Sequence, residues 1–295
     1  MHLISIIMNC YNGEKYLHDS ISSVINQKYK FWELIFWDNQ SNDNSKEIFL
    51  NFNDDRLKYF YAKEFTNLSQ ARNLAIDKSI GELITFLDVD DVWDDNKLLH
   101  QQRLYAENGT KIIYSNYRIL NERNNITSIY SKSRLPEGYI SNYLLKNYCV
   151  GLVTLMIESG IFKKEKYFFS SKYSVIGDFD LVFRLSQKYK IACYQSPICT
   201  LRKHLSNDSL ISLPKQINEL ELWKTENQLD SLFNKKIIHI DNKINYLKFI
   251  NLILNNKRIN SMKYIFFQKN YLIKFKMILI FFFIRKNYFL KFSKS

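Results

Sequence analysis

Acidic and amide side chains follow several short apolar runs of this chain, at points where strands would end. Asp88-Val89-Asp90-Asp91 follows the run Leu83–Leu87 and places three carboxylates within four residues. Carboxylates this close repel one another, which costs stability unless a cation is present. Because alternate side chains of a strand share a face, Asp88 and Asp90 can converge on one ion. All-oxygen ligands favour a hard divalent cation, so we expect Mg²⁺ or Mn²⁺.

The same acidic cluster has a second interpretation, as the start of a helix. Asp91 or Asp94 would then cap the following helix by accepting hydrogen bonds from its first backbone amides. Asp-x-Asp triplets are common by chance, so this cluster alone leaves both interpretations open.

Alternation of short apolar runs with helical patterns predicts the elements that position these residues. We expect strands at Leu3–Met8, Glu33–Trp37, Leu57–Tyr61 and Leu83–Leu87, and helices at Glu14–Asn26, through Ile48 and Phe52, and at Ser69–Lys78. This alternation is typical of right-handed βαβ units and a parallel sheet, hence an α/β fold. Ligands of such sheets bind beyond the carboxyl ends of the strands.

The second half of the chain predicts a mixed pattern and then helices alone. Strands are expected at Ile112–Tyr117, Ile126–Tyr130, Val150–Ile157, Ile191–Tyr194 and Ile198–Arg202, with a helix at Phe179–Lys188. Beyond Pro214 we expect only helices, at Lys215–Phe233, at Asp241–Leu254 and from Ser261 to about Tyr288. The predicted boundary near Ser212-Leu213-Pro214 separates a catalytic domain, 1–212, from a helical extension, 213–295.

Composition argues against several classes of protein. The 295 residues contain only 7 glycines and neither GxGxxG nor GxxxxGK[ST], which argues against a Rossmann dehydrogenase and a P-loop NTPase. The four cysteines form no CxxC pair and no metal-type cluster with the five histidines, so a reduced, cytosolic chain is expected. No signal peptide is expected, and no run reaches the roughly 18 apolar residues of a membrane span.

The net charge of +13 belongs almost entirely to the C-terminal end. Residues 242–295 contain 12 Lys and Arg and no acid, interleaved with Tyr and Phe, while the rest of the chain is nearly neutral. Such mixing suits an anionic membrane surface, and it also suits single-stranded nucleic acid. An ordinary packed helical subdomain is the third alternative.

Four sequence blocks resemble those of the family 2 glycosyltransferases. Residues 5–12 resemble the opening strand with its Tyr-Asn, 33–43 the second strand and its turn, 68–73 the Ala-Arg-Asn helix start, and 81–91 the Asp-x-Asp strand. The blocks occur in family order and at family spacing, and the match covers roughly residues 3–212. The resemblance implies a GT-A fold, which is a mixed, mainly parallel sheet flanked by helices. It also implies an enzyme that transfers a sugar from a nucleotide-diphosphate donor.

The resemblance also implies roles for individual residues. Asp178 matches the usual base of an inverting displacement, with Asp180 as the alternative, although Asp178 could instead simply cap the following helix. The implied metal ligands are Asp90, Asp88 and His204. The implied nucleotide-sugar contacts are Asn9, Tyr11, Asn12, Asp38, Arg72, Asp88 and His204. The chain departs from the family pattern at Asn9, Asn39-Gln40 and Gly177.

These observations together predict an inverting, metal-dependent glycosyltransferase of bacterial surface polysaccharide or lipopolysaccharide synthesis. By resemblance, a UDP-sugar is the favoured donor and a glycan or lipid-linked hydroxyl the acceptor. We expect a cytoplasmic protein, peripheral at the inner face of the cell membrane, that contacts the anionic surface and binds no nucleic acid. The sequence does not indicate an oligomeric state. The alternatives are a nucleotidyltransferase of similar fold and a nucleic-acid-binding protein that uses the basic tail.

Overall fold

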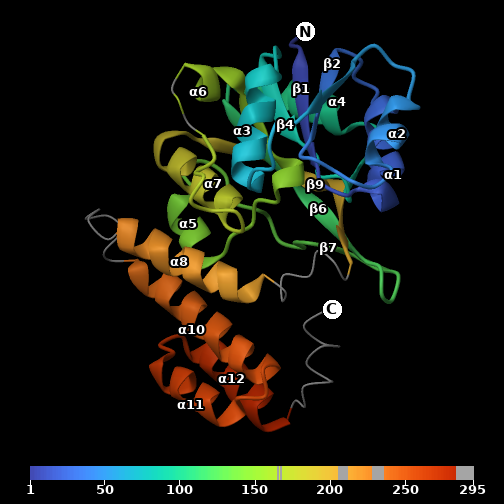
Figure 1. The fold of residues 1–295 in the computed structure, drawn as a ribbon. Helices are drawn as coiled ribbons and strands as arrows, with labels where there is room; N and C mark the ends of the chain where they lie inside the picture. Colours follow the sequence, from blue (N-terminus) through green and yellow to red (C-terminus); the bar gives the residue numbers. More distant parts are fainter. Residues whose placement is uncertain (165, 167, 205–211, 228–235, 284–295) are drawn as a thin grey trace. The chain divides into compact units, whose positions relative to one another are not determined.

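The computed structural model describes residues 1–164, 166, 168–204, 212–227 and 236–283, in two compact units (Figure 1). The first unit contains Met1–Ser141 and Tyr148–Lys203. The second contains Asn142–Asn147 and the described residues from His204 onward. Residues 205–211, next to the expected boundary at residue 212, lie outside the described residues, so that boundary stays a prediction.

A nine-stranded sheet with strand order β3-β2-β1-β4-β8-β6-β9-β5 forms the centre of the first unit, and β7 pairs with β6 outside this path. The strands are β1 Ile4–Cys10, β2 Trp32–Asp38, β3 Leu57–Tyr61, β4 Leu83–Phe86, β5 Val92–Trp93, β6 Ile112–Asn121, β7 Ile126–Ile129, β8 Met156–Glu158 and β9 Ile191–Lys203. The helices of this unit are α1 Glu14–Ile25, α2 Ser45–Leu50, α3 Leu68–Lys78, α4 Lys97–Asn108, α6 Ser159–Lys163 and α7 Gly177–Lys188. Helix α5 covers Ser141–Lys146, and Leu152–Thr154 form a short 3₁₀ turn.

The parallel half of the sheet is built from β1, β2, β3 and β4, as the alternation of patterns predicts. β1 and β2 are buried along their whole length, which explains their continuous apolar sequence. In register, Cys10 lies beside Asp38, and Ile7 lies beside Phe86 two residues before Asp88. The acidic cluster after β4 and the polar residues that follow β1 and β2 therefore share one edge of the sheet.

Three sequence expectations in the second half need correction. The run expected as one strand at Val150–Ile157 forms a 3₁₀ turn and the short strand β8, which pairs antiparallel with β4 and β6. Two expected strands merge into β9, whose parallel pairing with β6 shifts register around Asn116. A helix does follow the acidic cluster, but α4 begins at Lys97 after Asn96 with no side-chain cap, so neither Asp91 nor Asp94 caps it.

Within its described residues from Ser212 onward, the second unit contains the helices α8 Leu213–Asn227, α10 Ile237–Leu254, α11 Arg258–Phe267 and α12 Tyr271–Phe283. Their shared core contains Leu213, Ile217, Phe249, Ile250, Ile253, Ile265, Met277 and Ile280. Among the residues that the structure describes, no helix is both long and apolar enough to cross a membrane.

The single helix expected from Ser261 to about Tyr288 is instead two helices, and residues 284–295 lie outside the described part. Asn270 begins α12, because its side-chain oxygen accepts hydrogen bonds from the amides of Leu272 (3.0 Å) and Ile273 (3.1 Å). Gln268 just before it donates to the carbonyl of Asn242 on α10, 2.9 Å away. These amide contacts break the apolar run that the sequence pattern suggested.

Candidate active site

A cavity of about 320 Å³ at the carboxyl edge of the sheet collects three predicted site residues, Arg72, Asp88 and Asp178. Arg72 comes from α3, Asp88 follows β4, and Asp178 lies in the first turn of α7. Tyr117 on β6, Tyr148, and the backbone turn at Val150–Val153 complete much of the wall. Carboxylates, a guanidinium and phenols thus face one space that a polar ligand can enter.

Arg72 and Asp88 form an ion pair inside this cavity. The guanidinium is 3.1 Å from the Asp88 carboxylate, and the arginine side chain is only 8% exposed whereas that of Asp88 is 39% exposed. Burial fixes the arginine charge in place, since a guanidinium stays protonated in proteins. Besides pairing with Asp88, the buried Arg72 guanidinium can attract a phosphate group.

Asp178 is partly buried, and the hydroxyl of Tyr148 donates a hydrogen bond to it at 3.1 Å. Burial raises the pKa of Asp178, while the charge of Arg72, the Phe179 amide and the Tyr148 hydroxyl lower that pKa in part. A carboxylate with a raised pKa is a stronger base than an ordinary aspartate. The cavity position and the raised pKa both suit a group that accepts a proton from a hydroxyl.

Asp180, the alternative base, has different surroundings on the same helix. Its buried carboxylate is paired with Arg184, one turn further along, at 2.7 Å. Arg184 also donates to the carbonyl of Phe168, so the pair ties α7 to the preceding loop. Asp180 does not line the cavity that holds Asp178. The geometry therefore favours Asp178 as the base and a structural role for Asp180.

Arg202 of β9 holds the acidic turn in shape from the neighbouring strand. Its backbone amide donates to the buried carboxylate of Asp91 at 2.9 Å, and its guanidinium donates to the carbonyl of Asp90 at 3.0 Å. Burial, with the nearby charges of Asp90 and Asp88, raises the pKa of Asp91 well above the usual range. Asp91 is thus an anchor of the turn and not the helix cap considered from the sequence.

Asp88 and Asp90 suit a hard divalent cation in the type of oxygen they offer. Among the residues that the structure describes, no three His, Cys, Asp or Glu side chains converge as a ready ligand set. Mg²⁺ and Mn²⁺ sites in transferases commonly take one or two carboxylates and complete their coordination with substrate phosphates and water. The two aspartates fit that incomplete, substrate-completed kind of site.

Several hydrogen bonds hold the polar turn that follows β2. Asp38 is buried, and its carboxylate accepts hydrogen bonds from the Ser41 amide (2.7 Å) and the Tyr59 hydroxyl (2.6 Å). Asn39, which departs from the family pattern, bonds through its amide nitrogen to the carbonyl of Thr66 at 2.8 Å. The turn is therefore fixed by amide and carboxylate contacts, with Asp38 at its base.

Next to this turn, the β1–α1 connection carries Asn9, Tyr11 and Asn12. Asn12 has φ +55° and its side-chain oxygen accepts the Asn42 amide at 2.9 Å. The side-chain nitrogen of Asn9 is buried without a hydrogen-bond partner among the described residues. Tyr11 is exposed, and its ring meets that of Phe65 edge-on at 4.9 Å. An exposed aromatic pair is a suitable environment for a nucleobase.

His204 immediately follows β9, and the contacts assign it to the second unit. The structure does not group it with Asp88 or Asp90, so its place near a metal or diphosphate stays a prediction.

Sequence reasoning missed two aromatic residues of the site, Tyr148 and Phe65. Tyr148 lies in an irregular segment, and Phe65 in the loop between β3 and α3, so neither position has a periodic pattern that marks it. Only the fold brings Tyr148 to Asp178 and Phe65 to Tyr11.

The mixed, mainly parallel sheet with helices on its faces is the architecture of the GT-A fold. The sequence model of "Glycosyl transferase family 2" matches residues 5–160, more than half of the chain. The chain therefore belongs to glycosyl transferase family 2.

Several proteins similar in sequence carry specific names. The chain is 38% identical over 157 residues to UDP-Glc:alpha-D-GlcNAc-diphosphoundecaprenol beta-1,3-glucosyltransferase WfgD of Escherichia coli, covering 53% of this chain and 60% of that protein. It is 30% identical over 158 residues to a putative teichuronic acid biosynthesis glycosyltransferase, TuaG, of Bacillus subtilis, covering 53% and 62%. An uncharacterized glycosyltransferase of Rickettsia typhi is 31% identical over 231 residues, covering 75% and 70%. The matched region thus spans only about three fifths of the first two relatives.

Solved structures share the fold at low sequence identity. Staphylococcus aureus TarS residues 1–349 in complex with UDP-GlcNAc has a TM-score of 0.59 at 16% identity, with 88% of each chain covered. The mannosyltransferase PcManGT from Pyrobaculum calidifontis, in complex with GDP-Man and Mn²⁺, has a TM-score of 0.61 at 12% identity, covering 83% of this chain and 72% of that one. At such identities the likeness demonstrates the GT-A fold alone.

Proposed function

We propose that the protein is an inverting glycosyltransferase of bacterial surface glycan synthesis. It moves a sugar from a nucleotide-diphosphate donor, with a UDP-sugar favoured, to a hydroxyl of a glycan or lipid-linked acceptor. The observation that carries this proposal is the single cavity shared by Arg72, Asp88 and Asp178. The named relatives support it, because one has a UDP-glucose donor and a diphosphoundecaprenol-linked acceptor in its name and the other is named for teichuronic acid synthesis.

In the proposed reaction the acceptor oxygen attacks C1 of the donor sugar from the face opposite the diphosphate. The new C1–O bond forms as the bond to the leaving phosphate oxygen breaks, and the departing diphosphate takes that electron pair. Asp178 receives the acceptor's hydroxyl proton, which its raised pKa favours. Arg72 is a fixed positive charge in the same cavity and can stabilise the charge that builds on the diphosphate.

The proposed cation ligands are Asp90 and Asp88, with His204 retained from the sequence prediction. When bound, Mg²⁺ or Mn²⁺ supplies positive charge to the leaving diphosphate. Asp38, Tyr11, Asn9 and Asn12 form the proposed nucleotide end of the site, and we include Phe65 through its contact with Tyr11.

A screen of nucleotide-sugars with Mg²⁺ and with Mn²⁺ tests this function. We expect slow hydrolysis of one class of donor that depends on the cation and releases the nucleoside diphosphate. Release of inorganic pyrophosphate together with a nucleotidyl product would instead assign the protein to the nucleotidyltransferases. No cation-dependent turnover of any donor would contradict the proposal.

We also propose that the second unit contacts the cytoplasmic face of an anionic membrane. Its exposed large apolar side chains concentrate in α11 and α12, and include Phe266 (72% exposed), Tyr271 (87%), Leu272 (82%) and Phe275 (62%). The same helices carry lysines and no acid. Exposed apolar surface next to uncompensated positive charge suits an anionic bilayer surface, where each basic residue contributes about 1 kcal/mol.

A further inference from the structure

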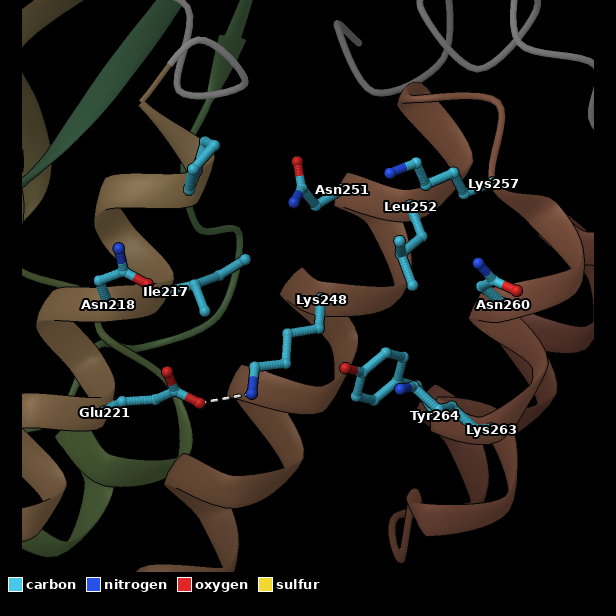
Figure 2. A pocket seen from close by; sticks show the side chains of 11 residues that line it. Ile217, Asn218, Glu221, Lys248, Asn251, Leu252, Lys257, Asn260, Lys263 and Tyr264 are labelled. Atoms are coloured by element: carbon cyan, nitrogen blue, oxygen red, sulfur yellow. Dashed lines mark ion pairs between the residues drawn. The ribbon is translucent and has the colours of Figure 1, made fainter.

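The second unit contains a cavity of about 570 Å³ between α8, α10 and α11 that no part of the proposed reaction uses. Three lysines line it, Lys248, Lys257 and Lys263, and we call it the lysine pocket (Figure 2). The pocket is also lined by the amide side chains of Asn218, Asn251 and Asn260 and by the phenol of Tyr264. Its apolar lining residues are Pro214, Ile217 and Leu252.

Charge in the lysine pocket is only partly balanced. Lys248 forms an ion pair with Glu221 across the gap between α10 and α8 (Figure 2). Within the described part of the chain, no carboxylate pairs with Lys257 or Lys263, and the Lys263 ammonium lies 5.2 Å from the centroid of the Tyr264 ring. Among the described residues, the pocket therefore has two ammonium groups that no acid neutralises.

The beginning of α11 adds a second source of positive potential. Lys257 is the residue before the first turn and makes no side-chain cap, and Asn260 lies within that turn. Both residues line the pocket. The first backbone amides of a helix have no partner within the helix and favour an anion. Helix end and lysines thus act on the same space.

We propose that the lysine pocket binds a phosphate group attached to a hydroxyl-rich molecule, such as a sugar phosphate or a phosphate-bearing lipid headgroup. The two unpaired lysines and the α11 amides bind the phosphate through charge-assisted hydrogen bonds. The asparagine amides both donate and accept, as recognition of hydroxyl groups requires. This binding is independent of the proposed function. Only its use to hold a phosphorylated acceptor depends on that function.

Calorimetric titration of the full-length protein with inorganic pyrophosphate tests the site. Excess EDTA removes the divalent cation that would support diphosphate binding between the aspartates of the first unit. The double variant Lys257→Gln/Lys263→Gln should weaken binding by about tenfold or more, because two charged contacts are lost. The control Lys269→Gln/Lys276→Gln removes the same charge from exposed lysines outside the pocket and should leave affinity unchanged.

A third variant should strengthen binding. Among the described residues that line the pocket, Glu221 is the one carboxylate, and Glu221→Gln also frees Lys248 from its ion pair, so pyrophosphate should bind more tightly. Unfolding cannot mimic a gain in affinity. Equal losses in both lysine pairs, no gain in Glu221→Gln, or no saturable binding to the unaltered protein would overturn the proposal.

Two further titrations identify the source of the phosphate. If α-glucose 1-phosphate binds more tightly than inorganic phosphate and the pocket variants affect both, the ligand is a phosphorylated sugar. If the Lys257→Gln/Lys263→Gln variant binds vesicles of phosphatidylcholine and phosphatidylglycerol more weakly than the control variant does, the ligand is a lipid headgroup. Either result supports a phosphate site. If both lysine pairs affect pyrophosphate, sugar phosphate and vesicles equally, the charge acts diffusely and the lysine pocket is not a site.

Discussion

Asp178 and Tyr148 form the contact on which the chemistry of the first unit depends. The hydroxyl of Tyr148 favours the charged form of Asp178, so Tyr148→Phe should raise the pKa of Asp178. A base must be unprotonated to act, so the acid limb of kcat/KM should move to higher pH in this variant. Tyr29→Phe is the control, because that hydroxyl donates to His2 outside the cavity. A limb that stays in place or moves to lower pH would contradict the proposed contact.

Lys97 is a buried titratable residue that the proposed reaction does not use. Its ammonium bonds to Thr85 and lies 3.6 Å from the centroid of the Trp93 ring, and burial lowers its pKa to about 7. Between that pH and about 10.5 the unfolded chain binds a proton that the folded chain has lost, so stability should rise with pH. Below pH 7 both states are protonated and this gain is absent.

Lys97→Met should remove that part of the pH dependence and stabilise the fold near pH 7. The largest expected difference in slope between the two proteins is about 1.4 kcal/mol per pH unit. Chemical denaturation at several pH values between 7 and 10 measures it. Parallel stability curves for the unaltered protein and the variant would show that the Lys97 pKa is ordinary.

At the level of elements, the approach of α7 to α3 explains one departure from the family pattern. A Cβ at Gly177 would lie 2.6 Å from the Ser69 hydroxyl oxygen, which itself bonds to the carbonyl of Tyr173. A side chain at this position would require Ser69 to shift, so packing disfavours any residue larger than glycine here. Glycine at this point allows the N-terminus of α7, with Asp178, to approach the cavity.

A double-mutant cycle tests this close approach. Gly177→Ala should destabilise the protein by about 1–3 kcal/mol through overpacking. In a Ser69→Ala background the offending oxygen is gone and the nearest remaining atoms lie 3.9 Å away, so Gly177→Ala should cost much less. Thermal unfolding of the four proteins gives the coupling. Additive effects of the two changes would show that the contact is not strained.

The sequence predicted the parallel half of the sheet well, because β1, β2 and β4 are continuous buried runs and β3 is a short, aromatic-rich run that is only partly buried. β3 begins and ends where expected, and β1, β2 and β4 differ by one or two residues. The prediction of one strand at Val150–Ile157 was wrong because some of its apolar residues are buried in a 3₁₀ turn. An apolar run alone does not distinguish a strand from a packed loop. The prediction of one continuous helix from Ser261 was wrong because the Asn270 side chain accepts two backbone amide hydrogen bonds and begins a new helix.

Site residues were predictable where they lie at the end of a strand or in a helix. Asp88, Arg72 and Asp178 lie in recognisable local motifs, and the cavity brings them together. The choice between Asp178 and Asp180 was open, because both acids lie in the first turn of one helix. The ion pair of Asp180 with Arg184 and the position of Asp178 in the cavity distinguish them. Tyr148 required the folded chain, since its contact with Asp178 joins residues thirty positions apart.

At the scale of the whole molecule, the two units divide chemistry from surface charge. We predict that Leu272→Ser/Phe275→Ser weakens binding to anionic vesicles mainly in its salt-resistant part, since both side chains are exposed apolar groups. Removing lysines instead should weaken the salt-sensitive part, because the Debye length falls from about 10 Å at 0.1 M to about 3 Å at 1 M salt.

Cosedimentation at low and high salt, with anionic and with neutral vesicles, measures both parts. Ile126→Ser/Ile129→Ser is the matched control, because these exposed apolar residues lie on β7 of the first unit. Equal binding to neutral and anionic vesicles would contradict the electrostatic contribution. Equal loss in the control pair would show that α11 and α12 are not the contact.

Paired variants of Asp178 and Asp180 test whether Asp178 removes the acceptor proton. With the donor found in the screen and its acceptor, Asp178→Asn should bind donor normally but transfer sugar about 10²–10⁴-fold more slowly, the usual contribution of a positioned base. Asp180→Asn should instead lower the thermal stability, through loss of the Arg184 pair, and leave the transfer rate of the folded protein nearly intact. Full transfer by Asp178→Asn, with loss in folded Asp180→Asn, would contradict the account and move the base to Asp180.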